Sequence, residues 1–131
     1  MQLNSYTMLD NLSIVKQEDT PSVILNKEEG LFEIGYRSLP ENAIAFYEPI
    51  INWLTEYIKD PLPKTIFNFK LEYFNTASAK QLAKILLILQ ELAQTNEVLI
   101  RWHYLKDDTD MHSSGIRFSK LLKIPFEFVE M

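Results

Sequence analysis

The sequence contains no cysteine, and only three of its 131 residues are glycine. Without cysteine the chain forms no disulfide, has no thiol nucleophile and offers no thiolate ligand for zinc. The sequence also lacks a phosphate-binding loop, a dinucleotide-binding glycine pattern and a nucleophile elbow. The commonest sequence signatures of thiol, nucleotide-binding and hydrolytic enzymes are therefore absent.

Long apolar runs and concentrated positive charge are missing as well. No apolar run is long enough to cross a bilayer, and the N-terminus has no signal-peptide pattern. The chain carries 13 Lys and Arg against 18 Asp and Glu, a net charge of -5, and its basic residues are scattered. We therefore expect a cytoplasmic protein that binds neither nucleic acid nor a membrane.

What the sequence does contain is enough apolar material for one folded domain. Hydrophobic residues make up 47% of the chain, with eight Phe, six Tyr and two Trp. Residues 1–19 are mixed and polar, and we expect a loosely ordered lead-in there. A short edge strand around Leu12, Ile14 and Val15 is the alternative for part of it. The domain itself is expected to span residues 20–131.

Hydrophobic periodicity predicts five strands and three helices in this domain. Strands are expected at 23–25, 31–36, 66–73, 97–104 and 126–128, the first two joined by a tight turn at Gly30. The capping-box spacing of Ser38 and Glu41, with Pro40 between them, predicts the start of the first helix. Asn75 precedes the second helix, and Asp107-Asp108-Thr109-Asp110 opens the third. The resulting order, β-β-α-β-α-β-α-β, is that of a mixed α/β domain.

Polar residues alternate with apolar ones in every expected strand. We therefore expect helices mainly on one face of the sheet and an open polar second face. In the central strand this pattern predicts an accessible Lys70 and four residues buried beneath the helices: Phe67, Phe69, Leu71 and Tyr73. Trp53 and Trp102 are expected in the core, and in the last helix the candidates for burial are Met111, Phe118, Leu121 and Leu122.

The junction between the central strand and the helix after it is rich in small polar residues. Asn75 is a good N-cap, which places Thr76 and Ser78 in the first helical turn. From the residues alone these are simply structural caps. Further along the expected outer face, Leu87 is a single exposed apolar residue beside Lys80 and Lys84.

Other chemistry-bearing residues have simpler interpretations. Asp107, Asp108 and Asp110 share one short loop, where acids favour the start of a helix, and no second loop supplies converging ligands. His103 belongs to the expected polar face. The spacing between His103 and His112 is not that of a pair of metal ligands. We expect the domain to fold without a metal or cofactor.

Several segments, which follow in order along nearly the whole chain, match those of a known protein family. They are Thr20-Pro21, Pro40-Glu41-Asn42 with Phe46-Tyr47-Glu48-Pro49, Phe69-Lys70-Leu71-Glu72-Tyr73-Phe74-Asn75-Thr76, Trp102-His103-Tyr104 with Asp107-Asp108, and Ile124-Pro125-Phe126. With these segments the chain resembles the SiaC-type regulatory phosphoproteins of bacteria, a family with a STAS-like fold. The family usually has Asn-Thr-Ser-Ser at the junction. Here Ala77 takes the third position.

The resemblance implies a non-enzymatic partner-switching protein, similar in logic to anti-sigma-factor antagonists. It implies that a dedicated kinase phosphorylates Thr76, that a PP2C-like phosphatase removes the phosphate, and that the unmodified form binds a downstream partner such as a diguanylate cyclase. The residues then expected to contact partners are Asn75, Ser78, Lys80, Lys84 and Leu87. Two alternatives remain: a constitutive binding module that uses the same helix, and a small enzyme or ligand-binding domain with its pocket at the carboxyl ends of the strands.

Overall fold

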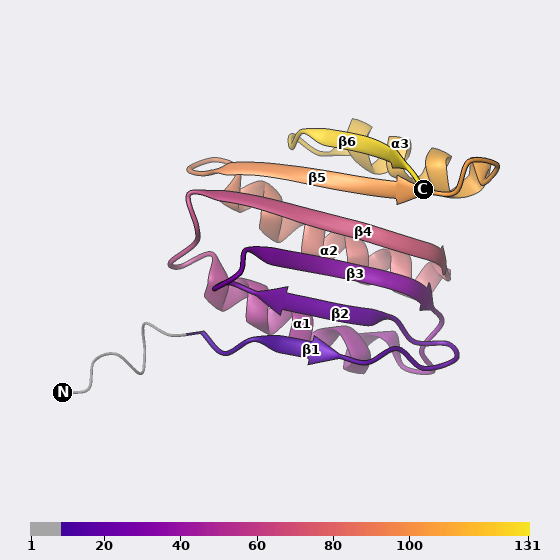
Figure 1. Cartoon of the computed structure of the whole chain (residues 1–131), viewed down its shortest axis with the longest axis horizontal. Coiled ribbons are helices and arrows are strands. Elements are labelled where there is room, and N and C mark those ends of the chain that lie inside the picture. The colour runs from indigo at the N-terminus through magenta and orange to yellow at the C-terminus, as the bar shows by residue number, and fades with distance from the viewer. Residues whose placement is uncertain (1–8) are drawn as a thin grey trace.

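The computed structural model describes residues 9–131, which form one six-stranded sheet with three helices packed on a single face (Figure 1). The strands and helices follow in chain order: β1 (Leu12–Ile14), β2 (Ser22–Asn26), β3 (Leu31–Ser38), α1 (Ala43–Tyr57), β4 (Lys64–Phe74), α2 (Thr76–Leu92), β5 (Glu97–Tyr104), α3 (Thr109–Leu121) and β6 (Phe126–Glu130). The mixed α/β class is confirmed. The strand count was one too low, because β1 adds the edge strand that the sequence offered only as an alternative.

The order of the strands in the sheet explains why all three helices share one face. The spatial order β1-β2-β3-β4-β5-β6 is also the chain order, with antiparallel pairing up to β3 and parallel pairing from β3 to β6. Each helix therefore connects two neighbouring parallel strands, and the sheet always grows in the same direction. Right-handed crossovers in one direction place every helix on the same side.

The other face of the sheet carries the polar ladder that the alternation predicted. Lys70 Nζ lies 3.0 Å from Glu33 Oε1, and Arg101 Nε lies 2.7 Å from Glu127 Oε1. Between these two pairs His103 Nε2 is 3.0 Å from Asn68 Oδ1. Both predictions, of one helix-covered face and of an accessible Lys70, are confirmed, since the Lys70 side chain is 40% exposed.

Aromatic residues fill the space between the helices and the sheet. Trp53 stacks on Tyr57 with ring centroids 5.3 Å apart, and Phe69 lies 5.4 Å from Trp102. Both tryptophans belong to the buried core, as predicted. Trp102 also donates a hydrogen bond from Nε1 to the carbonyl oxygen of Met111, 3.0 Å away, which fixes α3 against β5.

The first helix begins later than the sequence indicated. Ser38 is the last residue of β3, and α1 starts at Ala43, with Asn42 Oδ1 accepting from Ala45 N at 3.0 Å as the N-cap. The capping-box spacing at Ser38 was therefore a wrong indication. The Ser38 side chain is fully buried and bonds to groups on two helices instead.

Tyr73 is not buried beneath the helices, unlike Phe67, Phe69 and Leu71. The pairing of β3 with β4 shifts after Leu71, so that β4 contributes one extra residue, Glu72, and Tyr36 adopts a φ of 78° on the facing strand. Such a bulge reverses the alternation of side chains that follow it. Tyr73 is consequently 48% exposed, while Phe74 turns toward Trp102 with ring centroids 6.2 Å apart.

The prediction for α3 was wrong for Leu121, which is 80% exposed, while Met111 is buried and Phe118 and Leu122 are partly buried. Gly115 lies where α3 meets the Trp102 ring, and a Cβ at this position would come within 2.4 Å of Trp102 Cδ1. The close approach of helix and ring therefore needs a residue without a side chain. None of the helices in the described part of the chain is long and apolar enough to cross a membrane.

Candidate functional site

The junction of β4 with α2 presents one hydroxyl to solvent and hides another. Asn75 caps the helix as predicted, since its Oδ1 accepts from Ser78 N at 2.8 Å. Thr76 is the first residue of α2 and is exposed, whereas Ser78 is fully buried two residues later. Of the two hydroxyls in the first turn, only that of Thr76 is open to a modifying enzyme.

Ser78 faces the interior, where it meets the end of β3 and the first turns of α1. Its Oγ donates to the carbonyl oxygen of Ser38 at 3.0 Å and accepts from Ser38 Oγ at 2.8 Å. Ser38 Oγ is also 2.6 Å from the hydroxyl of Tyr47. Burial raises the pKa of Tyr47 from 10.0 to about 12, despite the hydrogen bonds that lower it. The Ser78 side chain is thus inaccessible to a partner, in contrast with the expectation from the sequence.

The outer face of α2 continues from Thr76 along the helix. Lys80 and Lys84 are exposed, and Leu87 is 54% exposed. Thr76, Lys80, Lys84 and Leu87 are spaced by four, four and three residues, which places them along one side of the helix. Neither lysine forms an ion pair with any residue of the described range 9–131. The sequence-predicted partner residues other than Asn75 and Ser78 therefore lie on one accessible surface.

A groove of about 340 Å³ separates the beginnings of α1 and α2 beside this surface. Ile44 on α1 is 64% exposed here, opposite Ala77 and Lys80 on α2. The complete lining is Glu41, Asn42, Ala43, Ile44, Ala77, Lys80 and Gln81. Sequence reasoning did not single out Ile44, which is one of many apolar residues in this helix. The available signal was that α1 has more apolar residues than one buried face can hold.

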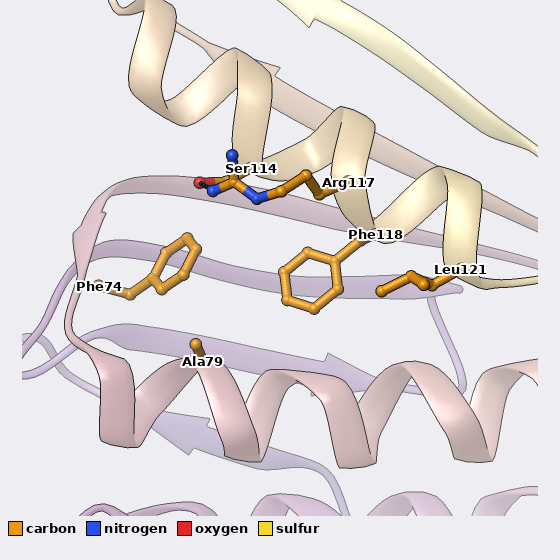
Figure 2. A pocket seen from close by; sticks show the side chains of 6 residues that line it. All are labelled: Phe74, Ala79, Ser114, Arg117, Phe118 and Leu121. Atoms are coloured by element: carbon orange, nitrogen blue, oxygen red, sulfur yellow. Dashed lines mark hydrogen bonds between the residues drawn. The ribbon is translucent and has the colours of Figure 1, made fainter.

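A second groove, of about 200 Å³, lies between α2 and α3 (Figure 2). Phe74 from the end of β4 and Ala79 from α2 face Phe118 and Leu121 of α3 across it. Arg117 and Ser114 contribute its polar atoms and bond to each other, with Arg117 Nη2 3.1 Å from Ser114 Oγ. Two grooves therefore flank the first turns of α2, one toward each neighbouring helix.

The remaining candidates have structural roles. Asp108 caps α3, because its Oδ1 accepts from Met111 N at 2.9 Å, and Asp110 lies in the first turn. His103 has a pKa below its usual value because of desolvation and the nearby positive charge of Lys70. His112 stacks on Tyr104 at 4.1 Å. Within residues 9–131 no three His, Cys, Asp or Glu side chains come together as a metal site would require.

Comparison with known proteins identifies the family of this chain. The model of the SiaC family of regulatory phosphoproteins matches residues 14–131, which include the whole α2 surface. The chain belongs to the SiaC family. It is a regulatory protein and not itself an enzyme.

Known SiaC relatives cover almost the whole chain. The solved structure of SiaC of Pseudomonas aeruginosa is 25% identical and has a TM-score of 0.84, with 93% of this chain and 99% of that chain covered. A second solved structure, from the same organism, is that of the diguanylate cyclase SiaD in complex with its activator SiaC. Its sequence identity is 26% and its TM-score 0.86, with 92% of this chain and 99% of that chain covered. An uncharacterised protein of Pseudomonas aeruginosa strain UCBPP-PA14 is 26% identical over 119 residues, 90% of this chain and 94% of that protein.

Proposed function

We propose that this SiaC family member is a cytoplasmic partner-switching protein that is controlled by reversible phosphorylation of Thr76. A dedicated kinase adds the phosphate and a PP2C-like phosphatase removes it. The observation that carries the proposal is the contrast within one helical turn between the exposed Thr76 and the buried Ser78. A kinase that reaches this turn meets a single available hydroxyl.

In this proposal the unmodified protein binds its downstream partner through the outer face of α2 and the α1–α2 groove. Thr76 borders this surface, and Ala77 and Lys80 line the groove. Ile44 and Leu87 supply the exposed apolar side chains, and Lys80 and Lys84 supply positive charge. A partner fitted to this surface contacts a neutral hydroxyl at Thr76.

Phosphorylation changes the charge of the surface by about -1.5 to -2 at neutral pH. The new phosphate lies at the start of α2, where the unpaired amides of the first turn stabilise an anion, and Lys80 is one turn away. The partner would then have to desolvate a dianion to make the same contacts. Release of the partner therefore requires no refolding of the domain.

A diguanylate cyclase is the partner class that the relatives favour. SiaC is the activator of the diguanylate cyclase SiaD in their complex, and this chain superimposes on that SiaC along nearly its whole length. By analogy, the unmodified form would activate a cyclase and the phosphorylated form would leave it inactive. The alternative is a constitutive binding module in which Asn75, Thr76 and Ser78 serve only as caps.

The test is phosphopeptide mapping after reaction with the cognate kinase. Thr109 is the natural control, because it is also an exposed first helical residue and also follows an N-cap. Label should appear on Thr76 and not on Thr109. Thr76→Ala should abolish it, Thr109→Ala should leave it unchanged, and in Ser78→Ala the label, although added more slowly, should still fall on Thr76. Label confined to another residue, or a partner complex that is indifferent to phosphate on Thr76, would refute the switch.

A further inference from the structure

We infer that Ser38, Tyr47 and Ser78 form a buried hydroxyl triad that positions Thr76 for its kinase and its partner. The inference rests on the proposed function and adds to it the residues that orient the modified turn. The three side chains come from three different elements, β3, α1 and α2, and all are fully buried. They are positioning residues, since none of them is open to a partner.

Ser38 holds the turn that contains Thr76 on both sides. Its carbonyl oxygen accepts a hydrogen bond from Asn75 N at 3.1 Å and a second from Ser78 Oγ at 3.0 Å. Thr76 lies between these two attachment points in the sequence. The backbone that carries the exposed Thr76 side chain is therefore held by a residue that precedes it by 38 positions, on a neighbouring strand.

The protons of the triad can be assigned completely. Ser78 Oγ donates to the Ser38 carbonyl oxygen, and Ser38 Oγ donates to Ser78 Oγ at 2.8 Å. The hydroxyl of Tyr47, 2.6 Å from Ser38 Oγ, must then be the donor in that contact. Each hydroxyl thus donates once, and the series leads from α1 through β3 to the first turn of α2.

The triad does something that an ordinary helix cap does not. The caps of α1 and α3 bond the backbone amide of the third helical residue, which is Ala45 in one and Met111 in the other. In α2 the same position is Ser78, whose side chain adds bonds to a strand and, through Ser38, to α1. The first turn of α2 is thus held in a fixed register with α1.

This register determines the shape of the proposed binding surface. The α1–α2 groove has Ala43 and Ile44 on one side and Ala77 and Lys80 on the other. Tyr47 follows Ala43 by one helical turn, and Ser78 directly follows Ala77. The triad therefore connects the two walls of the groove from below, and it sets how Thr76 is placed relative to Ile44.

Tyr57 provides a matched control for the test. It is the last residue of α1 and is also buried. Its hydroxyl lies 2.7 Å from Thr65 Oγ1, at the opposite end of α1 from the α1–α2 groove. Tyr47→Phe removes one hydrogen bond of a buried tyrosine, to Ser38, and Tyr57→Phe removes two from the same helix, to Thr65 and to the Leu62 amide. Both should lower the midpoint of denaturation, but only Tyr47→Phe should affect the Thr76 turn.

The experiment compares amide hydrogen exchange and kinase kinetics for the two variants and the parent. We expect Tyr47→Phe to accelerate exchange of the Ala79 amide, which bonds to the Asn75 carbonyl oxygen at 2.9 Å. We expect its initial rate of Thr76 phosphorylation to fall on the order of tenfold to a hundredfold, as for a misplaced reacting group. Tyr57→Phe should leave both quantities close to those of the parent.

Equal rates of exchange and phosphorylation in the two variants would overturn the inference. Ser78→Ala is the second variant, because it interrupts the same series of hydrogen bonds at its other end, between Ser78 and Ser38, and it should reproduce the Tyr47→Phe result. Should the parent take up no phosphate on Thr76, the proposed function fails on its own. The exchange data, which need no kinase, then still decide whether the triad fixes the turn.

Discussion

Thr76 and Ser78 share the first turn of α2 but face opposite surroundings: Thr76 is exposed, and Ser78 Oγ lies 2.8 Å from Ser38 Oγ in the interior. Their substitutions should therefore separate function from stability. Thr76→Ala should cost roughly 0.5 kcal/mol or less of the free energy of unfolding, as for most surface changes. Ser78→Ala should cost about 1 to 3 kcal/mol, because it leaves the buried Ser38 hydroxyl without its acceptor. Urea denaturation of both variants measures the difference, and similar losses would contradict the assigned environments.

The buried Tyr47 hydroxyl predicts loss of stability at high pH. Burial raises the pKa of Tyr47 from 10.0 to about 12, so the unfolded chain releases this proton first. Stability is then fully present below about pH 10 and falls as the pH rises toward 12, by about 1.4 kcal/mol per pH unit for one such group. Tyr57, whose pKa is also raised by burial, adds to the same effect. Denaturation curves at several alkaline pH values test this, and Tyr47→Phe should flatten the profile.

The contact between Gly115 and Trp102 predicts that a helix-favouring substitution will destabilise the protein. Gly115→Ala should gain up to about 1 kcal/mol of helix propensity. The added methyl group would nevertheless lie 2.4 Å from Trp102 Cδ1, and displacing the ring or the helix should cost about 1 to 3 kcal/mol more than that gain. Ser113→Ala, at an exposed position of the same helix, is the control and should be neutral or slightly stabilising. A thermal midpoint for Gly115→Ala equal to that of the control would refute the close packing.

The two grooves beside α2 can be distinguished by one charged substitution in each. Ile44→Arg lies in the α1–α2 groove and Leu121→Arg in the α2–α3 groove, and both residues are exposed enough for the fold to tolerate the change. Only Ile44→Arg should weaken the complex with the downstream partner, on the order of tenfold or more if Ile44 is an anchor residue. Titration calorimetry with the partner makes the measurement. A stronger effect of Leu121→Arg would move the binding surface to the other side of the helix.

Local sequence patterns predicted some features of this fold and missed others. Alternation predicted the sheet, its polar face and the burial of Phe67, Phe69 and Leu71, because these depend only on neighbouring residues along a strand. It failed at Tyr73, since a bulge depends on the partner strand, and the pairing shift between Tyr36 and Arg37 leaves no trace in local hydrophobicity.

The candidate site shows a similar division. The N-cap at Asn75 and the place of Thr76 in the first helical turn follow from local capping rules, and the structure confirms both placements. Ser38 has the sequence context of a helix cap. Its hydroxyl is instead hydrogen-bonded to Tyr47 and Ser78, which lie 9 and 40 residues further along the chain. Nothing in a local window distinguishes a serine that begins a helix from one that is buried in a network between distant elements.

The agreement between strand order and chain order has a consequence for how the protein is made. Each new strand from β2 to β6 is added beside the strand that was synthesised just before it. Pairing between consecutive strands allows the sheet to grow from its N-terminal edge as the chain leaves the ribosome. Ser38, Tyr47 and Ser78 have all been synthesised before β5 begins at Glu97. The polypeptide that forms the Thr76 turn and its anchor is therefore complete while the last quarter of the chain, from Glu97 onward, is still being translated.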